Sequence, residues 1–198
     1  SDFNNPSITI NYPLNASNFT YTSVPINTSI SDTNLQSCWY SNNSGQTNNT
    51  FTCGTNLTGD WEEGLNVIYV YANDSAGNTN NTEHIAFTVD TTPPTSTPTM
   101  TSPPDGASYT NNTWTKNNVK VTITASDSGV GYDNLAYPKY CWDTTNTCTP
   151  NTYISSGTTN TTEGILYIRF NSTDRIGNSE TIQSRTVKID KSAPSLTI

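Results

Sequence analysis

Residues 64–78 read GLNVIYVYANDSAGN, and residues 164–178 read GILYIRFNSTDRIGN. In each stretch, apolar side chains at alternating positions lead into the pattern Asp-x-x-Gly-Asn. Alternation of this kind predicts a β-strand, and the Asp, Gly and Asn that follow it predict a tight turn. In the second copy we expect Leu166, Ile168 and Phe170 to face one side of the strand, with Tyr167 and Arg169 on the other.

The two stretches belong to a longer repeat. Asp90 and Pro94 recur 100 residues later as Asp190 and Pro194, without insertion or deletion between them. Residues 6–10, PSITI, open the first copy, and residues 194–198, PSLTI, read as the opening of a third. Such a repeat indicates that each unit is one folded module and that the function belongs to the array. We predict domains over 1–93 and 94–193, with 194–198 as the start of a further repeat or a strand donated to a neighbour.

Short alternating runs precede the quoted stretch in each copy, at residues 24–30 and 119–125 and around the two Cys-Trp dipeptides. Each copy then holds about seven short strands separated by turn signals, and no stretch keeps a helical spacing. The pattern predicts an all-β fold class: two tandem immunoglobulin-like β-sandwich domains joined by a Pro/Thr-rich linker at residues 90–104. We expect Trp39 and Trp142 in the two cores, on central strands, and the alternative for both is stacking against a sugar.

The composition is polar, since 86 of the 198 residues are Asn, Ser or Thr and 31% are hydrophobic. Disorder is not expected, because only 12% of the residues are charged and the apolar residues fall in alternating runs. We therefore expect thin β cores under a polar surface.

The net charge of −8 is unevenly distributed. Residues 1–92 contain eight acids and no Lys or Arg, whereas from residue 93 onward eight basic residues offset eight acids. There is no basic stripe to neutralise phosphates, which argues against nucleic acid as a partner. No apolar stretch reaches the length of a membrane span, and the N-terminus does not read as a signal peptide.

The four cysteines fall as one pair in each copy, Cys38 with Cys53 and Cys141 with Cys148. One pair in each repeat predicts two local disulfides, formed in an oxidising compartment. Zinc binding is the alternative, but spacings of fifteen and seven residues, with one His in the chain, are poor zinc geometry.

Asn-x-Ser/Thr sequons occur throughout the chain, and most lie in predicted turns or at outward strand positions. A chain rich in Asn and Thr also produces some sequons by chance. We predict N-linked glycans on part of the set, which is Asn15, Asn18, Asn27, Asn42, Asn48, Asn56, Asn73, Asn80, Asn111, Asn160 and Asn171.

The order of an apolar strand, Asp-x-x-Gly-Asn and a Val/Ile-Asp-x-x-x-Pro ending resembles the tandem immunoglobulin-like repeats of bacterial and archaeal cell-surface proteins. The resemblance covers both copies, most strongly their second halves. The sequon density and acidic charge are more similar to archaeal exported glycoproteins than to bacterial adhesins. The resemblance implies an extracellular stalk, filament, surface layer or adhesin, with copies of itself or neighbouring repeats as partners.

Related extended adhesins hold calcium near their domain joints, so the resemblance also implies weak calcium candidates. Carboxylate oxygens suit this hard cation. The alternative is structural, because Asp and Asn side chains in such turns bind nearby backbone groups. We expect turns rather than a metal site, and no other cofactor. The candidates are Asp74, Asp90, Asp174 and Asp190.

No catalytic constellation is apparent in the sequence. Asp60, Glu62 and Glu63 offer the paired carboxylates that glycosidases use, but the second copy keeps only Glu163 there. His84 stands alone on the outward face of a predicted strand, without a nucleophile near it. We therefore expect a protein that is not an enzyme.

Two functional hypotheses remain open from the sequence. The first is a non-catalytic structural protein whose glycosylated modules form a stalk, filament or layer, with strand addition between subunits as one means of polymerisation. The second is an adhesin or carbohydrate-binding module that uses exposed aromatic residues, for which Trp61, Trp114 and Tyr132 are the candidates.

Overall fold

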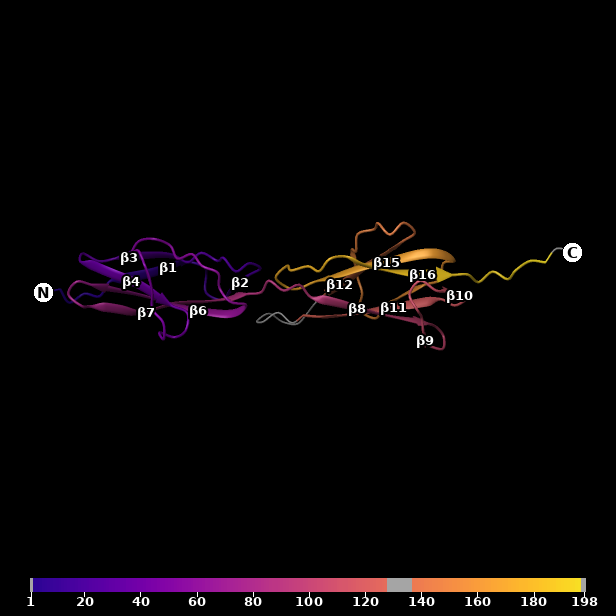
Figure 1. Ribbon diagram of the computed structural model, residues 1–198, viewed down its shortest axis with the longest axis horizontal. Coiled ribbons are helices and arrows are strands. Elements are labelled where there is room, and N and C mark those ends of the chain that lie inside the picture. Colours follow the sequence, from indigo (N-terminus) through magenta and orange to yellow (C-terminus); the bar gives the residue numbers. More distant parts are fainter. Residues whose placement is uncertain (1, 128–136, 197–198) are drawn as a thin grey trace. The chain divides into compact units, whose positions relative to one another are not determined.

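The computed structural model describes residues 2–127 and 137–196, and every regular element in them is a β-strand (Figure 1). The chain forms two compact units, and it passes from the first to the second between Thr92 and Pro93. Tyr132, one of the aromatic candidates, lies outside the described residues, as do the last two residues of the predicted donor strand. In the described part of the chain no helix has the length and hydropathy needed to cross a membrane.

The first unit consists of two sheets. One is an antiparallel pair, and the other has five strands in the order β2-β7-β6-β4-β5, with β2 parallel to β7. A bridge between Ile26 and Leu57 extends the smaller layer. The strands are β1 (Ser7–Tyr12), which pairs with β3 (Asn27–Ser31), and β2 (Ser17–Phe19), β4 (Leu35–Ser41), β5 (Asn49–Phe51), β6 (Gly64–Asp74) and β7 (Thr79–Val89).

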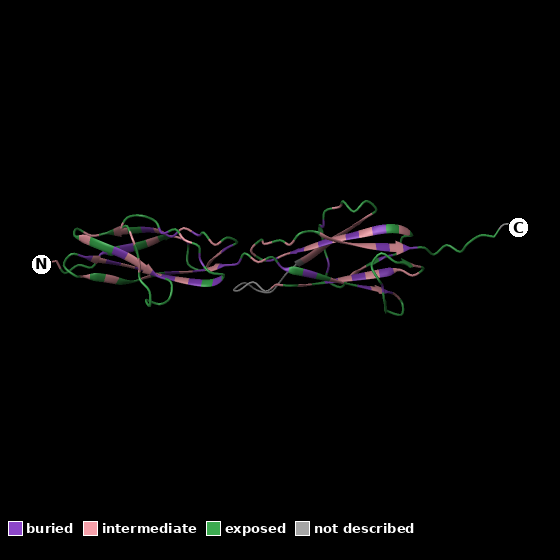
Figure 2. Cartoon of the chain, viewed as in Figure 1, coloured by how far each residue is buried: buried purple, intermediate pink, exposed green. Residues whose placement is uncertain are grey.

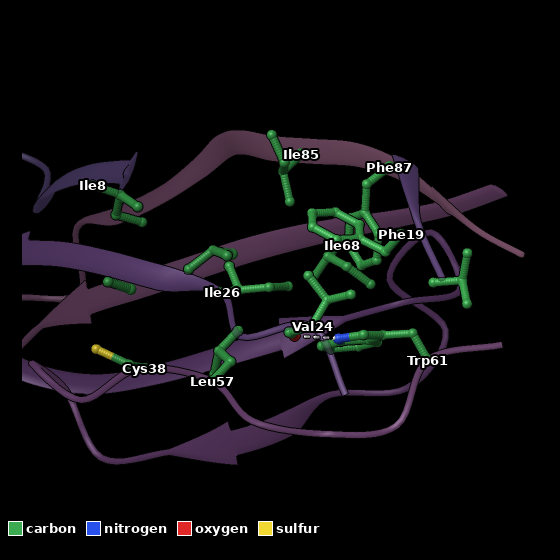
Figure 3. Close-up of a cluster of buried hydrophobic side chains, with 13 residues drawn as sticks. Ile8, Phe19, Val24, Ile26, Cys38, Leu57, Trp61, Ile68, Ile85 and Phe87 are labelled. Carbon is green, nitrogen blue, oxygen red and sulfur yellow. Dashed lines mark hydrogen bonds between the residues drawn. The ribbon is translucent and has the colours of Figure 1, made fainter. Parts of the chain in front are cut away.

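The core of the first unit follows the period of two along β6 and β7. Ile68 and Val70 on β6 and Phe87 on β7 are fully buried, and the residues between them face outward (Figure 2). Ile8 and Ile26 face them from the smaller layer (Figure 3). Burial of these side chains is the main stabilising contribution, roughly 1.5–3 kcal/mol for each large aliphatic or aromatic residue.

Trp61 is part of this core, so the prediction that it is exposed is wrong. Its side chain is 5% exposed, and its Nε1 donates a hydrogen bond to the Val24 carbonyl at 2.7 Å (Figure 3). Trp61 also lies edge-to-face against Phe87 and Tyr40. The indole packs there because its one polar atom finds a backbone acceptor inside the sandwich.

The second unit has the same plan with more strands. Its sheets have the orders β14-β11-β8-β9 and β10-β16-β15-β12-β13, with β10 parallel to β16. The strands are β8 (Thr95–Ser102), β9 (Ala107–Ser108), β10 (Trp114–Thr115), β11 (Val119–Ser126), β12 (Tyr137–Asp143), β13 (Thr152–Tyr153), β14 (Thr158–Asn160), β15 (Gly164–Thr173) and β16 (Gln183–Ile189).

The predicted fold class is confirmed. In each unit one sheet has three long antiparallel strands side by side, with a short strand parallel to the last of them at one edge and another short strand at the other edge. The first strand of each unit and its long antiparallel partner belong to the facing sheet. This is the strand arrangement of an immunoglobulin-like sandwich. Leu166, Ile168 and Phe170 are buried, and Tyr167 and Arg169 lie on the other side of β15, as the alternation predicts.

The predicted linker is too long. Residues 95–102 of the Pro/Thr-rich stretch form β8, which pairs with β11 from Thr95 to Thr101. The prolines favoured a linker in the sequence. In the structure β8 pairs with β9 only at Thr101 and Ser102, so among the described strands the edge of β8 at Pro98 is unpaired. A proline is tolerated at such an edge, and threonine favours extended structure.

Candidate functional site

The two Cys-Trp dipeptides have opposite orientations in their sheets. The cysteine faces the core in the first unit, and the tryptophan faces it in the second. Cys38 pairs across the sheet with the buried Ala72, so it faces the core and Trp39 faces outward. In the second unit Trp142 pairs with the buried Ile168 and packs against the core, so Cys141 faces outward. The core prediction therefore holds for Trp142 and is wrong for Trp39.

The register explains this difference. Tyr40 pairs with Val70 and Tyr140 with Phe170, so the position of Cys141 corresponds to that of Ser41 and not to that of Cys38. The dipeptides are displaced by three positions, and an odd displacement places a side chain on the other face of a strand. The signal was present in the sequence, because the dipeptides are 103 residues apart while the repeat has a period of 100.

Both disulfides close the hairpin that follows the Cys-Trp strand. The Cα atoms of Cys38 and Cys53 are 5.3 Å apart, and those of Cys141 and Cys148 are 6.2 Å apart. Neither disulfide joins the two sheets. On the chain-entropy model, each closed loop contributes about 2.5–3 kcal/mol to stability.

A pocket of about 410 Å³ opens beside the first disulfide. With both cysteines bonded, its lining contains no titratable side chain, so it offers no acid or base for catalysis. The lining residues are Leu35, Gln36, Ser37, Cys38, Thr50, Phe51, Thr52 and Cys53.

The hairpin of the second unit is organised by a carboxylate. The Asp143 side chain accepts hydrogen bonds from the backbone N–H groups of Thr147 at 2.7 Å, Cys148 at 2.8 Å and Asn146 at 2.9 Å. Burial raises the pKa of the Asp143 carboxyl, but these bonds outweigh it and lower the pKa to about 2. The carboxylate therefore stays ionised and holds the loop.

Four rings form a continuous row on the outer face of the large sheet in the first unit, and we call them the aromatic row. Trp39 stacks on Tyr71 with ring centroids 5.6 Å apart, Tyr71 on Tyr69 at 6.5 Å, and Tyr69 on His84 at 5.3 Å. Trp39 lies directly opposite Tyr71, and Tyr69 directly opposite His84. The row was not predicted from the sequence, because Trp39 was expected in the core. The alternation in β6 does place Tyr69 and Tyr71 on the outer face.

The Asp-x-x-Gly-Asn turns have the structural role expected of them. Asp74 Oδ1 accepts hydrogen bonds from the N–H groups of Ala76 and Asn78, and its Oδ2 accepts one from Asn78 Nδ2 at 2.7 Å. Asp174 holds its own turn in the same way, and Gly77 and Gly177 adopt positive φ. Burial raises the pKa of Asp74, but the bonds from Asn78 and the backbone outweigh it, so the pKa lies below its ordinary value.

Asp74 also approaches two other carboxylates. Carboxylate oxygens of Asp2, Asp32 and Asp74 lie within 4.8 Å of one another, an arrangement that offers a cation oxygen ligands. Asp2 and Asp32 were not among the calcium candidates. Asp190 accepts a hydrogen bond from the N–H group of Ser192 at 3.0 Å, and Asp90 one from that of Thr92 at 3.1 Å. Calcium binding stays a prediction.

The point where the chain leaves each unit is anchored by a glutamate. Glu63 accepts the N–H of Thr91 at 2.9 Å and also its hydroxyl, and Glu163 accepts the N–H of Lys191 at 2.8 Å. The preceding Asp90 and Asp190 donate their N–H groups to Phe19 and Thr115 carbonyls, both at 2.9 Å. The glutamate directly before β6 and β15 thus anchors the chain exit, which a catalytic interpretation of these acids does not explain.

The other predicted site residues differ in accessibility. Trp114 is 58% exposed and Trp61 is buried, so the two described adhesin candidates do not share a surface role. His84 is exposed, as predicted. Asn160 is only 8% exposed, and its Oδ1 accepts the N–H of Thr162. The exposed sequons are Asn15, Asn42, Asn48, Asn56 and Asn111, and Asn18, Asn27, Asn73, Asn80 and Asn171 are half-buried.

No protein-family model matches the chain, and no curated protein matches it. Among solved structures, the chain is similar to the fibronectin(III)-like modules of CbhA from Clostridium thermocellum. The identity is 17% and the TM-score 0.39, over 92% of this chain and 94% of that one. At these values nothing about function is taken from the similarity, and the fold class rests on the strand order described above.

Proposed function

We propose that the chain is a non-catalytic structural part of an extracellular glycoprotein. In this glycoprotein, immunoglobulin-like modules build a stalk, filament or layer at the surface of a prokaryotic cell, and specifically of an archaeon. The two disulfides favour an oxidising location outside the cytosol. The repeated sandwich favours an array whose length is its function.

The observation that carries the proposal is the anchored chain exit. In both units a glutamate before the penultimate strand binds the residue that follows the exit aspartate. A module in which hydrogen bonds fix the path of the outgoing chain can be repeated, because every copy then leaves its chain in the same direction. We infer that such anchoring serves a structural array.

The segment after the second exit fits the same scheme. Residues 194–196 are exposed and begin the sequence PSLTI, whose first copy, PSITI, leads into β1 paired with β3. We propose that this segment forms the first strand of another module, either in cis or in a neighbouring subunit by strand addition.

Electron microscopy of native cells labelled with a gold-conjugated antibody against the chain tests the proposal. We expect label on extended, regular structures outside the cell. Label confined to the cytoplasm, or to isolated soluble protein, contradicts it.

Mass spectrometry of the native protein tests the glycans separately. We propose glycans on some of the exposed sequons and none on Asn160, because its side chain is buried and bonded within its own turn. Glycan-bearing peptides that contain Asn42, Asn48 or Asn111 are expected. An unmodified native chain contradicts this part of the proposal and leaves the structural role standing.

A further inference from the structure

The outer face of the large sheet in the first unit is unusually apolar. The outward positions of β6 are Leu65, Val67, Tyr69 and Tyr71, and Leu65 is 69% exposed. Solvent-facing positions of an antiparallel sheet are usually polar. A contiguous exposed apolar patch marks an interaction surface.

The equivalent face of the second unit carries cations at the matching positions. Lys139 stands where the first unit has Trp39, and Arg169 stands where it has Tyr69, since Lys139 pairs with Asn171 and Arg169 with Ser184. Lys188 adds a third cation on β16, next to Ile165. We call Lys139, Arg169 and Lys188 the basic face. The rings of the first unit and the cations of the second thus occupy equivalent positions with the same spacing, because the large sheets of the two units have the same register.

We propose that the aromatic row of one copy's first unit binds the basic face of another copy's second unit. Charge selects this partner. Residues 1–92 carry eight acids and no Lys or Arg, so two first units repel each other, and two basic faces do so as well. A contact between unlike units instead places the cations of the basic face against a unit that has eight acids and no Lys or Arg.

The chemistry of the two faces is complementary. Cations attract the faces of aromatic rings, and the second unit already makes such contacts, with Lys139 Nζ 4.9 Å from the Tyr153 ring centre and Lys188 Nζ 5.9 Å from that of Trp114. Arg169 donates one hydrogen bond, from Nη1 to the Cys148 carbonyl at 2.7 Å. A guanidinium has five N–H groups, so others can reach the tyrosine hydroxyls or the open face of Trp39.

The contact is heterologous, because it joins two different surfaces. Each copy then carries one surface of each kind, so one chain can take part in two such contacts. This inference is independent of the proposed end-to-end array, since it concerns association through sheet faces.

Sedimentation velocity of the full disulfide-bonded chain over a range of concentrations provides the test. We expect reversible association at low salt that weakens at least about tenfold between 20 and 500 mM salt, because the attraction is screened. The row variant is Trp39→Lys/Tyr69→Arg, which introduces residues that the same fold accepts in the second unit. The face variant is Lys139→Gln/Arg169→Gln, and its charge-matched control is Lys116→Gln/Lys120→Gln.

We expect each variant alone to be monomeric, the control to behave as wild type, and a mixture of the two variants to form a 1:1 complex. The mixture works because each variant retains one intact surface. Association of the face variant with itself overturns the proposal, as does a mixture that stays monomeric. A wild-type chain that remains monomeric at low salt, even if its row binds an oligosaccharide, overturns it too.

Discussion

The hairpins after β4 and β12 occupy the same place in two copies of one fold and are stabilised differently. In the first, Asn43 Oδ1 accepts the N–H of Thr47 at 2.9 Å, and the disulfide lies against the core. In the second, Asp143, at the corresponding position, accepts the N–H of Thr147, and the disulfide faces outward. The sandwich fixes the strands, while the loop between them can use an amide or a carboxylate.

The largest expected effect distinguishes Trp61 in the first unit from Trp114 in the second. Trp61→Ala should destabilise the first unit by about 3–5 kcal/mol, because it removes a buried indole and leaves the Val24 carbonyl without its donor. Trp114→Ala should change stability by no more than about 0.5 kcal/mol, since the side chain is mostly exposed.

Hydrogen exchange read separately for each unit measures both effects, because a two-unit chain has no single unfolding transition. Equal effects of the two substitutions would contradict the burial of Trp61.

Removal of the disulfides should affect the units unequally. Cys38→Ser/Cys53→Ser places a hydroxyl in the first core and is expected to cost about 3–5 kcal/mol, against about 2–3 kcal/mol for Cys141→Ser/Cys148→Ser. Urea unfolding of each variant, followed by unit-resolved hydrogen exchange, checks the order. A larger loss in the second unit would contradict this order, because loop closure also favours the longer loop of the first unit.

The anchored exits predict a local change in the backbone. Glu63→Gln should raise hydrogen exchange at the Thr91 amide by up to about tenfold, because a neutral amide is a weaker acceptor than a carboxylate. Glu62→Gln is the matched control, since Glu62 is exposed and adjacent. NMR exchange rates at Thr91 measure the effect, and equal rates in both variants would argue against the anchor.

Acid should loosen the second hairpin and spare the first. The folded pKa of Asp143 is depressed to about 2, so its contribution is complete above the unfolded value near 4 and is lost as the pH falls from about 4 towards 2. Asn43 carries no charge and has no such dependence. NMR of the Thr47 and Thr147 amides between pH 5 and 2 tests the contrast, and Asp143→Asn should abolish it.

Much of this architecture could be predicted from the alternation in the sequence. The burial of Leu166, Ile168 and Phe170 on one face was predicted correctly, because apolar residues at every second position of a long strand all lie on the same face. Trp39 was misplaced because matching dipeptides were assumed to share a register, and three intervening positions reverse the face. The acceptor for the Trp61 indole belongs to a distant loop, so its burial was invisible in the local sequence.

The short strand β2 has a consequence for the molecule under load. It runs parallel to β7, with Ser17 opposite Phe87 and Phe19 opposite Val89, so an early strand and the last strand lie side by side. Tension applied through the two ends of the unit pulls these strands in opposite directions along their length. The hydrogen bonds between β2 and β7 are then loaded in shear and must break together, whereas bonds pulled from one end of a hairpin break one after another. The module would thus yield abruptly at a threshold force.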